Sequence, residues 1–98
     1  MDYSFTIQAT HPSLEGHFPN NPIVPGVVII DEVINILKNL KPELTVTAIP
    51  MVKFTHPLLA EQQVAVELKE KSDTAISFSC SHNKIQLVTG QLTLKVKE

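Results

Sequence analysis

Hydrophobic and polar residues alternate along five segments of the chain, as they do in strands that bury one face. In the first segment, residues 3–9, the apolar side chains of Tyr3, Phe5 and Ile7 share one face. The other four segments follow one another in the second half of the sequence, at residues 45–55, 63–71, 74–81 and 85–96. The pattern predicts five strands. It also predicts an irregularity at Pro50, because proline has no N–H to donate to a neighbouring strand.

Between the first two of these segments the period becomes helical. From Val27 to Leu40 one broad arc is apolar: Ile29, Ile30, Val33, Ile34, Ile36, Leu37 and Leu40. The opposite arc holds Val28 among the polar residues Asp31, Glu32, Asn35, Lys38 and Asn39. Pro25 suits a helix start and Pro42 stops a helix. We therefore predict one helix that is wrapped by the sheet and whose polar arc faces solvent or another protein chain.

The segments "KSDT" (residues 71–74) and "SHNK" (residues 81–84) are typical of hairpin turns. The order is then one strand, one helix and four strands joined by short turns. This order predicts an antiparallel sheet packed on one central helix, which is an α+β fold. No repeat or change of composition divides the sequence, so we expect residues 1–98 to form a single domain.

Charge and composition narrow the function. A net charge of −2 and the absence of arginine argue against nucleic-acid binding. A hydrophobic fraction of 43% with only 18% charged residues leaves apolar surface for a partner, so an oligomer is expected. No apolar run is long enough to span a membrane, the N-terminus does not resemble a signal peptide, and Cys80 is the only cysteine. We therefore expect a cytoplasmic protein.

The candidate chemistry lies in "GHFPNNPIVPGVVIID", residues 16–31. Three prolines stiffen the segment between Gly16 and Gly26, and it runs directly into the helix. His17 is a candidate base near neutral pH, and the N–H groups at the helix start near Gly26 can bind a negatively charged oxygen. Asp31, if partly desolvated, is a candidate acid. Together these groups suit proton abstraction beside a carbonyl followed by loss of a leaving group. They allow β-elimination from a thioester, but they do not single it out.

The same segment resembles the signature of the β-hydroxyacyl-ACP dehydratases of fatty acid synthesis, the FabA and FabZ type. The resemblance implies a hot-dog fold, in which an antiparallel sheet wraps around one long helix, and a homodimer or a higher oligomer with its active site at the interface. It implies that His17 removes the α-proton, that Asp31 of the other subunit protonates the leaving 3-hydroxyl, and that the Gly26 N–H holds the thioester oxygen. Phe18 and Val27 are expected to line the substrate site. The implied partner is an acyl carrier protein or coenzyme A thioester, with no cofactor or metal.

The chain departs from that family in places. Asp31 is an aspartate, as in the FabA branch, and Asn35 replaces the usual glutamine. "VKFTHPLLAEQQVAVEL" resembles the family's next strand–turn–strand, but Ala60-Glu61 stands where the family has Pro-Gly. A small stand-alone form, such as those of aryl-polyene or other secondary lipid pathways, fits better than housekeeping synthesis. A hot-dog thioesterase and a non-catalytic acyl-binding subunit are the alternative functions.

Other chemistry-bearing residues have simpler interpretations. His11, Glu15 and His17 do not form a recognisable metal motif. His56 and His82 are expected at the surface, and Cys80 is expected to be a small buried hydrophobe. The solvated lysines, some of which could meet an acidic carrier protein, are Lys38, Lys41, Lys53, Lys69, Lys71 and Lys84.

Overall fold

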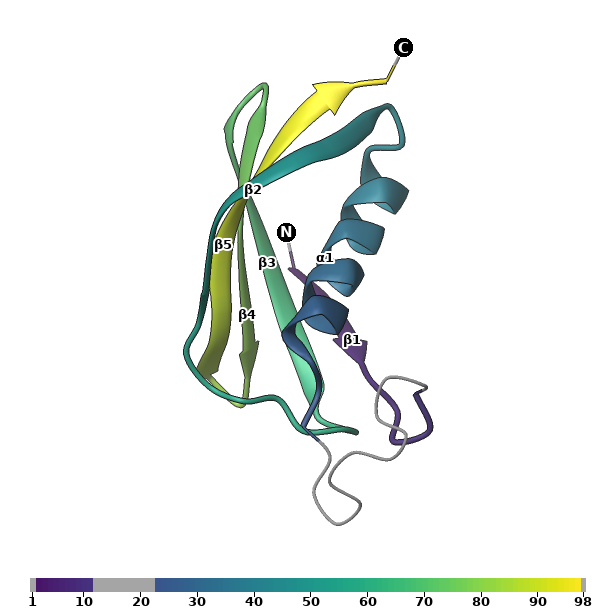
Figure 1. The fold of residues 1–98 in the computed structure, drawn as a ribbon, viewed down its shortest axis with the longest axis vertical. Helices are drawn as coiled ribbons and strands as arrows, with labels where there is room; N and C mark the ends of the chain where they lie inside the picture. The colour runs from purple at the N-terminus through teal and green to yellow at the C-terminus, as the bar shows by residue number, and fades with distance from the viewer. Residues whose placement is uncertain (1, 12–22, 98) are drawn as a thin grey trace.

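The structure is a computed structural model that describes residues 2–11 and 23–97. Its elements are β1 (Asp2–Thr6), α1 (Gly26–Leu40), β2 (Leu44–Phe54), β3 (Gln63–Ser72), β4 (Ala75–His82) and β5 (Ile85–Val96). The strands form one antiparallel sheet in the order β1-β3-β4-β5-β2, and α1 lies against one face of that sheet (Figure 1). The predicted α+β architecture is confirmed.

Two hairpins join β3, β4 and β5, and both turns fall where the sequence predicts them. Asp73 and Thr74 make the first turn, and Asn83 and Lys84 make the second. Asn83 has φ 50° and Lys84 has φ 67°. Two successive central residues with positive φ are typical of a type I′ turn, whose twist matches that of the strands on either side.

The sequence does not indicate which strand lies beside β2. In the structure β2 pairs with β5, so the expected short turn between β2 and β3 is replaced by a longer connection. The segment of residues 55–62, here called the β2–β3 connection, passes under the end of the sheet to reach β3 (Figure 1). Alternation along a strand identifies which face it buries, but it does not identify the strand that lies next to it.

The irregularity expected at Pro50 is present. The register of β2 against β5 shifts between Val46 and Ala48 and again between Ala48 and Met51. β1 ends at Thr6, earlier than predicted, and directly after it the Ile7 carbonyl accepts a hydrogen bond from the Glu61 N–H in the β2–β3 connection.

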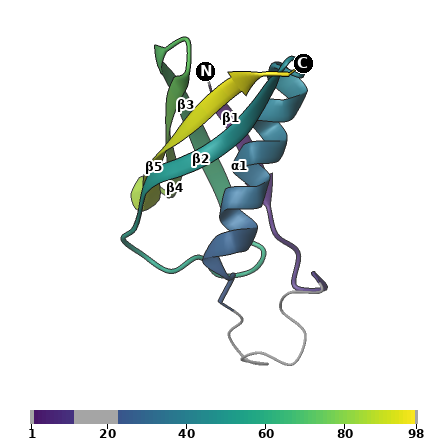
Figure 2. The same ribbon diagram turned by 45° about the horizontal axis from the view of Figure 1, so that its top comes forward.

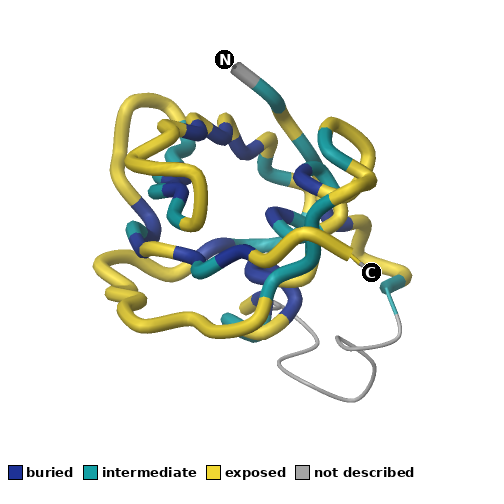
Figure 3. Tube along the Cα trace, turned by 90° about the horizontal axis from the view of Figure 1, so that it is seen from above, coloured by how far each residue is buried: buried dark blue, intermediate teal, exposed yellow. Residues whose placement is uncertain are grey.

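The core lies between α1 and the sheet, and buried positions occur on both (Figures 2 and 3). Most of the predicted apolar arc of α1 is buried or half-buried, but Leu40 at its end is exposed. Val28, on the predicted polar arc, is buried within the chain itself. The segment after β1 lies next to this side of α1, since one pocket is lined by Thr6, Ile7, Gln8, Thr10, His11 and Glu32. No helix in the described part of the chain is long and apolar enough to cross a membrane.

Candidate active site

The first turn of α1 presents backbone donors that no described side chain caps. Pro25 precedes the helix with φ −59° and ψ 142°, and the Val28 N–H donates to the Pro25 carbonyl at 3.0 Å. By their position, the N–H groups of Gly26 and Val27 have no intrahelical acceptor. The first turn also contains no acidic residue that would neutralise the positive end of the helix dipole. This end of α1 is suited to bind an oxygen that carries negative charge.

Gly26 has a packing reason to be glycine. A Cβ added at this position would lie 2.6 Å from Cζ of Phe54, the last residue of β2. The Phe54 ring therefore lies directly on the helix start, while about half of the residue remains exposed, at 50%. The close approach that glycine permits at this position is that of the Phe54 ring.

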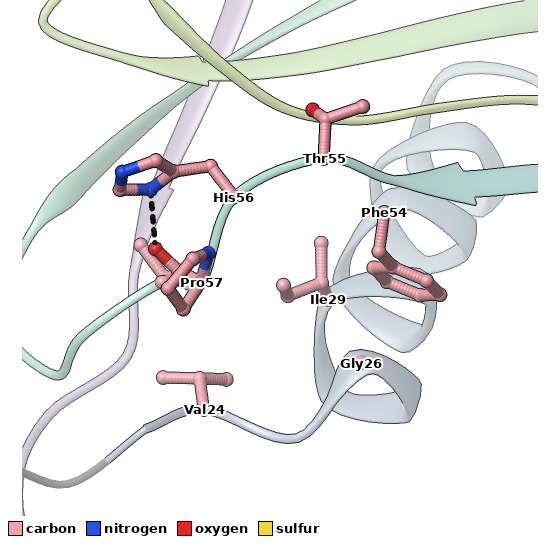
Figure 4. A pocket seen from close by; sticks show the side chains of 8 residues that line it. Val24, Gly26, Ile29, Phe54, Thr55, His56 and Pro57 are labelled. Carbon is pink, nitrogen blue, oxygen red and sulfur yellow. Dashed lines mark hydrogen bonds between the residues drawn. The ribbon is translucent and has the colours of Figure 1, made fainter.

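A pocket of about 480 Å³ opens at this junction of α1 with β2. Its lining is mainly apolar and comes from Val24, Gly26, Ile29, Phe54, Thr55, His56, Pro57 and Leu58. Figure 4 shows these side chains arranged around the opening, with α1 on one side and the β2–β3 connection on the other. The pocket combines apolar walls with the polar start of a helix, which is the arrangement expected of a small-molecule site.

Among the described residues that line this pocket, His56 is the titratable one, and the sequence predicted it only as a surface residue. It is exposed, and its Nδ1 lies 2.9 Å from the Pro57 carbonyl oxygen (Figure 4). Because a carbonyl can only accept, Nδ1 is the donor in this hydrogen bond. Neither the spacing nor the neighbours of His56 in the sequence indicated that it would lie beside the start of α1.

The predicted site residues do not all meet in this pocket. Gly26 lines it, whereas Val27 and Asp31 are on the outer side of α1, where Val27 is 66% exposed and Asp31 is exposed as well. The desolvation expected for Asp31 is therefore absent in the single chain. His17 and Phe18 lie outside the described residues.

Beside the exposed side of α1, the edge of the sheet carries apolar side chains on its surface. β2 has no strand partner on its outer side within the described residues. Its exposed large side chains are Ile49, Met51, Val52 and Phe54. A second pocket, between Ile34 and Lys38 of α1 and residues 45–49 of β2, continues the same strip along the helix. Unpaired strand edges with apolar side chains are typical sites of protein association.

Two other titratable groups among the described residues, Cys80 and His82, lie away from this pocket. Cys80 is buried, and burial raises the pKa of its thiol to about 12, so it stays protonated and unreactive. His82 Nδ1 lies 2.7 Å from the Gln63 carbonyl oxygen, next to the hairpin turn between β4 and β5. Within residues 2–11 and 23–97, no three histidine, cysteine or acidic side chains gather as metal ligands would.

Comparisons with known proteins identify the family and the fold. Residues 1–91 match the model of the ApeI-like family, described as ApeI dehydratase. Among solved structures, the chain is similar to the dehydratase heterocomplex ApeI:P from Xenorhabdus doucetiae, with 25% identity and a TM-score of 0.82 over 95% of this chain and 84% of that chain. No protein with a curated description matches the sequence.

More distant structures share the fold alone. The (R)-hydratase from A. caviae, involved in PHA biosynthesis, matches with 14% identity and a TM-score of 0.71 over 99% of this chain and 93% of that chain. The fluoroacetyl-CoA thioesterase FlK matches with 16% identity and a TM-score of 0.67 over 99% and 84%. The predicted hot-dog fold is thereby confirmed, and it is a fold that both hydratases and thioesterases use.

Proposed function

The chain belongs to the ApeI-like dehydratase family, and on that premise we propose that it removes water from 3-hydroxyacyl thioesters to give 2-enoyl thioesters. The observation that carries the proposal is the start of α1 at Gly26, which no described side chain caps and which borders a mainly apolar pocket. We propose that the acyl group is carried by an acyl carrier protein or by coenzyme A, and that the reaction takes place in the cytoplasm.

In the proposed reaction, His17 removes the proton from the carbon next to the thioester carbonyl. The negative charge that develops on the carbonyl oxygen is stabilised by the Gly26 N–H at the positive end of α1. The electron pair then forms the new carbon–carbon double bond as the 3-hydroxyl leaves. Asp31 gives its proton to that hydroxyl, so that water departs, and proton transfer from His17 to Asp31 through solvent restores both groups. Phe18 and Val27 are proposed to line the site around the reacting carbons.

A second subunit is part of the proposal. Asp31 is exposed on the side of α1 next to the apolar edge strand β2, where a partner would cover it and supply its desolvation. We propose a homodimer in which β2 and this side of α1 are buried, with Asp31 of one subunit working beside His17 of the other. The solved structure with 25% identity is described as a heterocomplex, so a related but different chain is the alternative partner.

Mass spectrometry of a 3-hydroxyacyl carrier protein incubated with the purified protein, together with a free-thiol assay, tests the reaction. We expect loss of one water with no thiol released. We expect that loss to fall by roughly 10²–10⁴-fold in His17→Ala and in Asp31→Asn, the range for a lost general acid or base. His82→Ala and Glu32→Gln are the matched controls and should keep the activity.

The other outcomes separate the alternatives. Release of thiol with loss of the whole acyl group would identify a thioesterase, an activity that the same fold supports in FlK. No turnover across several chain lengths, with tight binding of the acyl thioester, would identify an accessory subunit. Activity that appears only after a second protein is added would replace the homodimer with a heterodimer.

A further inference from the structure

Three segments of the chain meet at the β2–β3 connection, far from one another in the sequence. At its start, the N–H groups of Thr55 and His56 both donate to the Leu87 carbonyl, at 2.8 and 3.3 Å. Thr55 Oγ1 also donates to the Gln86 carbonyl at 2.8 Å. These bonds fix the connection to the beginning of β5, so it is a rigid element rather than a loose crossing.

The connection holds the chain at both ends of residues 12–22. On the helix side, the Val24 N–H donates to the Leu58 carbonyl at 2.8 Å, and Ile23 forms an isolated bridge with Leu59. Val24 and Leu58 are both buried. On the β1 side, the Glu61 N–H donates to the Ile7 carbonyl at 2.8 Å. Two described anchor points therefore flank the segment to which His17 belongs.

Glu61 makes the β1-side anchor with its side chain as well as its backbone. Its Oε1 accepts a hydrogen bond from the Ala9 N–H at 2.8 Å. Together the two hydrogen bonds hold residues 7–9 against Glu61, and this part of the chain precedes His17 in the sequence. An ionised carboxylate that accepts from a backbone N–H makes a stronger bond than a neutral acceptor does.

The backbone of Glu61 is in a conformation that this residue adopts at a cost. Its φ is 68°, in the left-handed region that glycine enters without penalty and glutamate does not. Glycine at this position would remove the strain and would keep the N–H bond to Ile7. It would lose only the carboxylate that binds Ala9. A residue with a strained backbone whose side chain also makes a specific long-range contact is a candidate for a functional role.

We propose that Glu61 is a positioning residue, which fixes the chain at Ala9 so that His17 is held in place for proton abstraction. This inference rests on the proposed function for the role of His17. It concerns a different question, namely what sets the geometry of the base. Misplacement of a catalytic group by about 1 Å can cost up to roughly 10²-fold in rate, so even a small loosening at Ala9 would be measurable.

Three variants separate the side-chain bond from the backbone conformation. Glu61→Gly removes the carboxylate and relieves the strained φ. Glu61→Gln keeps an amide oxygen that can accept from Ala9. Lys84→Gly is the matched control, because Lys84 has nearly the same φ, 67°, in the hairpin turn between β4 and β5.

Hydrogen exchange and steady-state kinetics are measured on all three variants. In Glu61→Gly we expect faster exchange of the Ala9 amide and of peptides covering residues 7–22, and a kcat roughly tenfold lower with KM unchanged within about twofold. Glu61→Gln should restore both quantities to within about twofold, and Lys84→Gly should alter neither. If Glu61 only stabilised the fold, Glu61→Gly would lower the melting temperature, but it would not lower kcat while KM stays unchanged.

Unchanged exchange at Ala9 in Glu61→Gly would overturn the proposal, and so would faster exchange with kcat at the wild-type value. The failure of the proposed function has a different signature. If the wild-type protein removes no water from any thioester, then dehydration is wrong, and with it the role of Glu61 in positioning a base. The exchange data would still show whether Glu61 anchors the segment.

Discussion

The β3–β4–β5 part of the sheet and β2 at its edge are both rich in apolar side chains, but they use them in different ways. In β3 as far as Leu68 and in β4 as far as Cys80, every second residue is buried, as the sequence predicts: Val64, Val66, Leu68, Ile76, Phe78 and Cys80. In β2 the apolar residues from Ile49 to Phe54 are exposed, and the register against β5 is interrupted twice. The first region stabilises the domain, and the second is available for a partner and a ligand.

This difference teaches where substitutions should separate stability from activity. Residues on the inner face of β3 to β5 contact only the chain's own core, so their truncation costs folding free energy. Residues of β2 and the start of α1 gain their environment from a pocket and from a proposed second subunit. Their substitution should change association and turnover more than it changes folding.

The largest effect is expected from a charge at the edge strand. In Val52→Asp the unpaired carboxylate would be buried in the proposed dimer, which costs several kcal/mol, or at least about 10²-fold in the dimer dissociation constant. We expect a folded monomer that lacks dehydratase activity, as measured by sedimentation velocity, circular dichroism and product analysis. Gln91→Asp, on the neighbouring strand β5, should remain a dimer. A fully active Val52→Asp monomer would refute the shared site.

A truncation in the stable region should have a large effect on folding. Leu92 is completely buried in β5, and Leu92→Ala should lower the free energy of unfolding by about 2–5 kcal/mol, from lost burial and the cavity that remains. Its exposed neighbour provides the control, since Gln91→Ala should stay within about 0.5 kcal/mol of wild type. Urea denaturation measures both. Equal losses in the two variants would mean that β5 is not the distinct, buried region described here.

A moderate effect is expected at the contact between the end of β2 and the start of α1. The added methyl group of Gly26→Ala would collide with the Phe54 ring and displace it, at a cost of about 1–3 kcal/mol. Because the ring also lines the pocket, we expect activity to fall as well. The double variant Gly26→Ala/Phe54→Leu should recover stability relative to the single one. If it does not, the contact between Gly26 and Phe54 is not the reason for the glycine.

The smallest effect is expected at the far end of α1. Lys41 Nζ lies 2.6 Å from Glu70 Oε1, and this hydrogen bond and the charge of Glu70 raise the pKa of Lys41. A raised lysine pKa contributes stability that is fully present below its ordinary value of about 10.4 and is lost as the pH rises through the raised value. Since the pair is solvent-exposed, Lys41→Met should destabilise slightly at neutral pH, and this difference should vanish at high pH or high salt. A difference that persists in strong alkali would have another cause.

Much of the fold could be predicted from the sequence, because periodicity directly reports which faces are buried. The helix, the hairpin turns and the strands β3 to β5 were predicted close to their observed bounds. The pairing of β2 with β5 and the burial of Val28 were missed, since both depend on which segments lie next to each other after folding.

The candidate site was predictable where its chemistry is local. Gly26 at the start of α1 follows from the helix and the proline before it. His56 and Glu61 were not predicted as site residues, because their positions arise from hydrogen bonds between segments that are far apart in the sequence. The roles of His17, Asp31, Phe18 and Val27 remain predictions.

The two register shifts in β2 have a consequence for insertions and deletions. One shift alone turns every later side chain to the opposite face of the sheet, and a second shift turns it back. Val46 and Val52 are therefore both opposite core-facing positions of β5, Leu94 and Gly90, whereas Ala48 between them is opposite Thr93. With the register before it kept, removal of one residue from 47–50 would bring Thr55 to the place that Phe54 occupies at the helix start. Removal of two would straighten the strand and leave its faces unchanged, so natural variation in length here should come in steps of two.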